Sequence, residues 1–259
     1  MTATREVNPK TYTVSATAGT GGSISPTSRS VAQGSSTTFT VTPQTGHIIN
    51  SVTGCAGTLS GSTYTTGAIA AACTVSASFR PITHIVSASA GAGGSISPTS
   101  RSVNQGSSTT FTVTPQTGHV INSVTGCAGT LSGSTYTTGV IAAACTVSAS
   151  FRPITHTVST SAGAGGSISP TSRSVNQGSA TTFTVTPNAG YKIVSATGCN
   201  GKLTGNTYNI GPITAACSVS ASFSLITHAV AATAGTGGSI SPTSRSVAQG
   251  STTTFTVTP

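Results

Sequence analysis

The chain has 259 residues, of which only 4% are charged, and its formal net charge of +9 comes from ten basic residues set against one acid. The basic residues form no runs, which argues against a nucleic-acid-binding polycation. The single acid is Glu6, so the chain after it lacks the carboxylates that acid-base catalysis and calcium or magnesium sites usually require.

A block with the sequence GGSISPTSRSV recurs along the chain, and its arginines lie 72 residues apart, as positions 29 and 101 show. The four copies of the block each contain one arginine, and these are Arg29, Arg101, Arg173 and Arg245. The cysteines keep the same step, with Cys55, Cys127 and Cys199 in one series and Cys73, Cys145 and Cys217 in the other. Such a fixed period indicates a tandem array of similar modules.

The period divides the chain into a leader, three complete repeats and part of a fourth. The predicted boundaries are 1–10 for the leader, then 11–82, 83–154 and 155–226 for the repeats, and 227–259 for the partial repeat. A permuted division into 44–115, 116–187 and 188–259 fits the same period and stays open at this level.

In chain order, the first repeat shows period-two alternation of apolar with Ser or Thr residues over residues 12–17, 38–42 and 73–79. This alternation predicts strands with one buried face and one hydroxyl face toward water. Turn signals rich in Gly, Pro and Ser separate the runs and leave room for about six short strands per repeat. Residues 68–72 are too few for an independent helix and are expected to form a turn or a single helical turn.

The pattern therefore predicts an all-β protein, built as a tandem array of small β-grasp-like or β-sandwich-like modules. The junctions between modules are short, and a proline stiffens the first two, at Pro81 and Pro153. We expect a semi-rigid rod. The third junction, residues 224–227, lacks the Arg and Pro of the others and is expected to bend more.

Each repeat contains two cysteines 18 positions apart, as Cys55 and Cys73 illustrate. A disulfide in each module would close this loop and stabilise the small fold by about 3 kcal/mol. The alternative is a zinc site completed by His47 and His84. The repeats argue against zinc, because the His47 position is Tyr191 in the third repeat and the His84 position is Tyr12 in the first. These positions instead suit a half-buried amphipathic ring.

No catalytic, metal-binding or cofactor-binding residues are predicted. The Gly-rich runs lack the spacing of dinucleotide-binding or phosphate-binding loops and are expected to form tight turns. The arginines at 29, 101, 173 and 245 could together contact a polyanion by multivalency, although a solvated loop arginine is the simpler interpretation.

The even cysteine count predicts an oxidising, extracellular setting. Residues 1–10 contain no apolar export-signal core, and no stretch approaches the roughly 20 apolar residues of a membrane span. An export signal or anchor is expected to lie outside this sequence, and we expect no direct membrane insertion.

An ordered series of motifs runs through each repeat: GGSISP, TFTVTP, TGC and AACTVSASF. In the third repeat the last motif reads AACSVSASF. This series resembles the divergent internalin B-repeat type of bacterial surface and secreted proteins. The resemblance implies a β-rich, β-grasp-like stalk or adhesive spacer without catalytic residues. One departure is that members often carry Trp after the Gly-Tyr strand, where this chain has Val52, Val124 and Ala196.

The leading functional hypothesis is an extracellular structural or adhesive repeat protein that forms a semi-rigid stalk or a surface fibre. The alternative is a carbohydrate- or polyanion-binding repeat module that acts by multivalency. The expected partners are like chains, through fibre formation or lateral association, or surface glycans, and no nucleic acid. An enzyme is the least favoured class.

Overall fold

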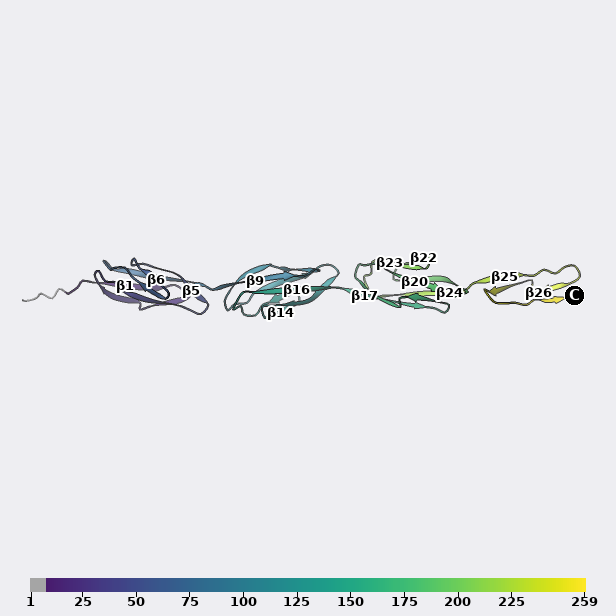
Figure 1. The fold of residues 1–259 in the computed structure, drawn as a ribbon, viewed down its shortest axis with the longest axis horizontal. Helices are drawn as coiled ribbons and strands as arrows, with labels where there is room; N and C mark the ends of the chain where they lie inside the picture. The colour runs from purple at the N-terminus through teal and green to yellow at the C-terminus, as the bar shows by residue number, and fades with distance from the viewer. Residues whose placement is uncertain (1–7) are drawn as a thin grey trace, which may run out of the picture. The chain divides into compact units, whose positions relative to one another are not determined.

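The computed structural model describes residues 8–259, and every regular element in that range is a β-strand (Figure 1). The predicted all-β class is therefore confirmed. Glu6 and most of the predicted leader lie outside the described residues. By their internal contacts the described residues form two compact units, one of residues up to Thr114 with Ile121–Ser150 and the other of Pro115–Val120 with Phe151–Pro259.

The first module consists of eight strands, two more than the sequence suggested. They are β1 (Thr11–Ala18), β2 (Gly22–Ser25), β3 (Ser28–Ala32), β4 (Thr38–Pro43), β5 (His47–Thr53), β6 (Thr58–Ser60), β7 (Thr63–Thr65) and β8 (Cys73–Pro81). The predicted number of strands was low because a tight turn and a short hairpin were not recognised in the sequence. The turn at Pro26, whose peptide bond is cis, separates β2 from β3, and β6 and β7 form a hairpin of three-residue strands.

These strands form two four-stranded sheets. One has the order β3-β1-β8-β5, in which the first and last strands of the module, β1 and β8, pair in parallel at the centre. The other has the order β2-β4-β7-β6 and is antiparallel throughout. The central parallel pair joins the two ends of the module within one sheet.

The same topology recurs in the next two modules. The second contains β9 (Thr83–Ala90), β10 (Gly94–Ser97), β11 (Ser100–Asn104), β12 (Thr110–Pro115), β13 (His119–Thr125), β14 (Thr130–Ser132), β15 (Thr135–Thr137) and β16 (Cys145–Pro153). The third contains β17 (Thr155–Ala162), β18 (Gly166–Ser169), β19 (Ser172–Asn176), β20 (Thr181–Pro187), β21 (Tyr191–Gly198), β22 (Lys202–Thr204), β23 (Thr207–Ile210) and β24 (Cys217–Leu225).

The core of each module lies between its two sheets and follows the predicted alternation. In the first module Val14 of β1 and Val75 of β8 face Phe39 and Val41 of β4, and all four are buried. Burial of such side chains contributes about 1.5–3 kcal/mol each, which makes this layer the main source of stability for so small a module. The intervening Ser and Thr residues point outward, as predicted.

Residues 68–72 contain no helix, in agreement with the predicted turn. Ile69 fills the open end of the core and is only 2% exposed. Its amide donates to the carbonyl of Ser35, and its carbonyl accepts from the amide of Gly34. The segment is thus fixed by the loop between β3 and β4. Within residues 8–259 no helix is long and apolar enough to cross a membrane.

The fourth repeat forms four strands, β25 (Thr227–Ala231), β26 (Ser239–Ser241), β27 (Ser244–Ala248) and β28 (Thr256–Thr258). They pair only as β25-β27 and β26-β28. Val230 is 39% exposed and Val257 is 67% exposed, whereas the matching Val14 and Val41 are fully buried. The difference follows because β25 has no partner corresponding to β8 among the described strands.

Candidate functional site

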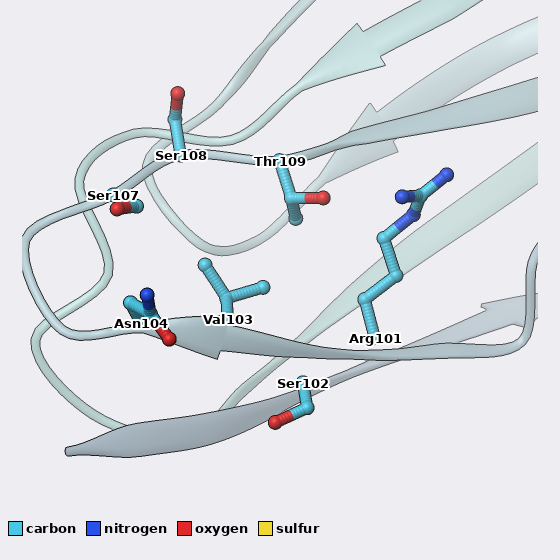
Figure 2. Close-up of a pocket in the computed structure, with 7 residues that line it drawn as sticks. All are labelled: Arg101, Ser102, Val103, Asn104, Ser107, Ser108 and Thr109. Carbon is cyan, nitrogen blue, oxygen red and sulfur yellow. The ribbon is translucent and has the colours of Figure 1, made fainter. Parts of the chain in front are cut away.

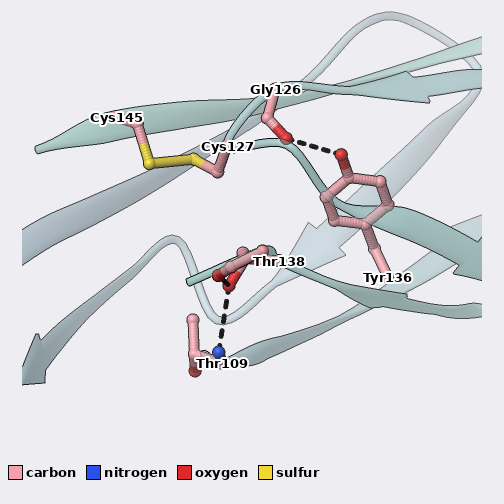
Figure 3. The surroundings of a disulfide bond; sticks show 7 residues. Thr109, Gly126, Cys127, Tyr136, Thr138 and Cys145 are labelled. Atoms are coloured by element: carbon pink, nitrogen blue, oxygen red, sulfur yellow. Dashed lines mark hydrogen bonds between the residues drawn. A yellow bond between two sulfur atoms is a disulfide. The ribbon is translucent and has the colours of Figure 1, made fainter. Parts of the chain in front are cut away.

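A disulfide joins the two cysteines of every complete module, which confirms the predicted bond. Figure 3 shows the bond between Cys127 and Cys145, whose Cα atoms lie 5.6 Å apart. The other two modules have the equivalent bonds Cys55–Cys73 and Cys199–Cys217. The described residues contain no free cysteine. The zinc alternative is therefore left without thiolate ligands.

The turn that carries the first cysteine depends on the glycine before it. Gly126 has a φ of 110°, and a Cβ there would lie 2.0 Å from the carbonyl oxygen of Thr146. Cys127 and Ala128 follow with φ values of 48° and 47°, in the left-handed region that residues with a Cβ seldom adopt. The buried Tyr136 hydroxyl donates to the carbonyl of Gly126 at 2.5 Å, and this hydrogen bond ties the turn to the core (Figure 3).

The rings at the proposed zinc positions are half-buried, as the His/Tyr exchanges suggested. His47 lies across Gly21, where an added Cβ would fall 2.5 Å from the ring, and Tyr191 covers Gly165 in the same way. His84 faces the side chain of Gln105 at 3.4 Å. Packing of the ring, rather than a fixed ligand atom, is what the three modules share.

The repeated arginine lies on the edge strand of the parallel-centred sheet. In the second module this strand is β11, and Arg101 pairs with Val86 of β9. Figure 2 shows the side chains of Arg101 and Val103 on one face of β11, with that of Ser102 on the other. Arg101 thus takes a core-facing register position where the sandwich opens to solvent, and it remains exposed.

A groove of about 350 Å³ lies beside Arg101, and we name it the arginine groove. Val103 lies at its base, and the loop between β11 and β12 forms the opposite wall, with the Thr109 side chain directed toward Arg101 and the Ser108 hydroxyl directed away (Figure 2). A second groove lies at the equivalent place in the fourth repeat and includes Arg245. Both linings contain one arginine and four Ser or Thr residues.

Hydrogen bonds fix the loop that forms the wall of the arginine groove. The amide of Thr109 donates to the hydroxyl of Thr138, and the amide of Thr138 donates back to the carbonyl of Thr109 (Figure 3). The carbonyl of Ser107 accepts from the amide of Ile141 at 2.8 Å. The amide and carbonyl groups of Ser107 and Thr109 are thus already bonded, which leaves their side-chain hydroxyls to meet a ligand.

The third module has a modified version of the arginine groove. Ala180 stands where the second module has Ser108, so the loop has one hydroxyl fewer. Arg173 donates to the hydroxyl of Thr181 at 3.2 Å, and its guanidinium lies 5.8 Å from the centre of the Phe183 ring. This arginine therefore has partners inside its own module.

The sequence indicated the four arginines but not the hydroxyls opposite them. Each arginine is followed eight positions later by a threonine, at Thr37, Thr109, Thr181 and Thr253. The constant spacing was the available signal. Its meaning depends on the turn that brings the loop back over the edge strand, which the residue pattern alone does not specify.

Comparison with known proteins gives one family. A family model described as the divergent InlB B-repeat domain matches residues 12–83, 84–155 and 156–227. These segments cover the three modules with complete sandwiches. A search of curated proteins found no match to the chain.

Proposed function

Because the chain belongs to the divergent InlB B-repeat domain family, and each complete module carries a disulfide, we propose that it is an extracellular structural repeat protein. Its modules would serve as a semi-rigid, non-catalytic spacer or adhesive stalk. Nearly identical modules suit this role, since a spacer needs length more than distinct sites.

The observation that carries the proposal is the junction between modules. Only Ile82 separates β8 from β9. Its amide donates to the carbonyl of Gly46 in the first module, and its carbonyl accepts from the amide of Gln105 in the second, both at 2.8 Å. A linker residue bonded on both sides has little freedom to rotate, which supports a stiff connection.

The absence of acids supports a non-catalytic role. Residues 8–259 contain no Asp or Glu, so a Ser-His-acid arrangement or a carboxylate general base has no source among them. The cysteines are consumed by disulfides, which removes them as nucleophiles.

Small-angle X-ray scattering of the chain in solution tests the spacer role. Nine-residue strands such as β8 are about 30 Å long. Three and a half such modules joined end to end would give a radius of gyration of about 30 Å. A compact protein of 259 residues would give about 18 Å. A value near 18 Å would contradict the proposal.

A further inference from the structure

The arginine groove has the chemistry of an anion-binding site, and we propose that it binds sulfate or carboxylate groups of an acidic polysaccharide. The site would occur once per module. This inference goes beyond the spacer role and does not depend on it, since a compact array of the same modules would present the same grooves.

The first argument is charge. A guanidinium offers five donors in a planar fork that matches the oxygens of carboxylate or sulfate. No residue in 8–259 carries a carboxylate side chain, so Arg101 has no acidic side chain to pair with in the described part of the chain. An anion from another molecule can therefore reach this exposed side chain without displacing an ion pair in that range.

The second argument is preorganisation. The hydroxyls of Ser107 and Thr109 stand on a loop whose main chain is bonded to Thr138 and Ile141. A ligand in the arginine groove would meet these hydroxyls without first ordering the loop, which lowers the entropic cost of binding. Hydroxyl walls also suit the many hydroxyls of a sugar chain.

The composition of the arginine groove favours a polysaccharide over a nucleic acid. Its seven lining residues include no aromatic side chain on which a base could stack. The basic residues are isolated, so contact with a uniformly charged phosphate backbone would be sparse. Single weak contacts repeated in successive modules can still add up along one long polysaccharide.

A competing interpretation is that the arginine only protects the edge strand. Inward-pointing charges on edge strands prevent sheets from pairing edge to edge, and Arg101 has such a position. This interpretation predicts self-association, and no change in anion binding, when the arginine is replaced. The two interpretations therefore give opposite results in a binding assay.

The experiment compares two variants of the full chain that have the same net charge. The groove variant replaces the four repeated arginines by glutamine: Arg29→Gln, Arg101→Gln, Arg173→Gln and Arg245→Gln. The control replaces four exposed basic residues elsewhere: Arg80→Gln, Arg152→Gln, Lys192→Gln and Lys202→Gln. Both changes lower the formal charge from +9 by four, to +5. Binding is measured at low salt to immobilised heparin, to a polyuronate, to duplex DNA and to neutral dextran.

We expect the groove variant to lose binding to heparin or the polyuronate by about tenfold or more, and the control to lose no more than about threefold. The two acidic probes distinguish sulfate from carboxylate recognition. Equal losses in both variants would reduce the effect to net charge and overturn the proposal. So would an absence of binding to either acidic probe, or binding to duplex DNA that matches or exceeds binding to both. Self-association without a binding change would favour edge protection.

A milder variant guards against misfolding as the cause of lost binding. Thr37→Val with Thr109→Val removes the hydroxyl at the position where Thr109 points toward Arg101, at nearly constant side-chain volume. We expect a loss of binding in the same direction but smaller. Unchanged binding would show that the hydroxyl wall takes no part and would contradict the proposed site.

Discussion

Removal of one disulfide tests the contribution of the cysteine pair to each module. In the third module the variant is Cys199→Ala with Cys217→Ala. The bond closes a loop with a sequence separation of 18 residues. The chain-entropy relation then gives a loss of about 3 kcal/mol. Both cysteines also pack against the core of that module, so the lost sulfur contacts act in the same direction.

Native-state hydrogen exchange with mass spectrometry measures this loss within the intact chain. A loss of about 3 kcal/mol corresponds to a fall in protection of about 150-fold. It should appear in the amides of β24, which pairs with both β17 and β21. The third module suits the measurement because its sequence differs from the nearly identical first and second.

The matched control is Cys127→Ala with Cys145→Ala, which should leave exchange in the third module unchanged. The reasoning would be refuted if β24 lost less than about threefold of its protection. It would also fail if the control lowered protection in the third module equally, because the bond would then act on the whole chain rather than on its own module.

Three other changes follow from local contacts. Gly166→Ala should destabilise the third module by about 1–3 kcal/mol, seen as a lower urea midpoint, because the new Cβ would lie 2.3 Å from the Phe223 ring. Ala128→Asn should stabilise the second module by up to about 1 kcal/mol in the same assay, because Asn tolerates the left-handed φ better and Asn200 already holds this position in the third. Burial raises the pKa of the Tyr208 hydroxyl. The unfolded state therefore releases this proton first, and stability contributed at Tyr208 should be present below pH 10 and decline as the pH rises above it. Tyr208→Phe should lower the free energy of unfolding by about 1 kcal/mol at pH 8 and remove the decline above pH 10. Urea unfolding at pH 8 and above pH 10 measures both effects, and an undiminished decline would contradict the assignment.

Much of the module could be predicted because its signals are local. Alternation such as Thr38-Phe39-Thr40-Val41 specifies both a strand and its buried face, and the structure buries Phe39 and Val41 accordingly. The cysteine pairing was also accessible, since a fixed spacing within a fixed period leaves one partner per module.

The arginine groove could not be predicted in the same way. Arg101 and Thr109 come together because the loop between their strands folds back and is bonded to Thr138 and Ile141, which lie about 30 positions further along the chain. Strand register decides which side of β11 the arginine occupies. Such pairing is not local, so the residue pattern identified the arginine without its surroundings.

The third junction has main-chain hydrogen bonds that its side-chain pattern did not reveal. It lacks the Arg and Pro of the first two, and the sequence suggested a looser connection. Ile226 nevertheless donates to the carbonyl of Gly190 and accepts from the amide of Gln249, both at 2.8 Å. All four groups belong to the main chain, so replacing Arg and Pro by Ser224 and Leu225 removes none of them. The three junctions thus share an isoleucine that is hydrogen-bonded to a glycine and a glutamine. These residues recur with the same 72-residue step as the cysteines. This local geometry gives the third connection the same hydrogen-bonded restraint as the first.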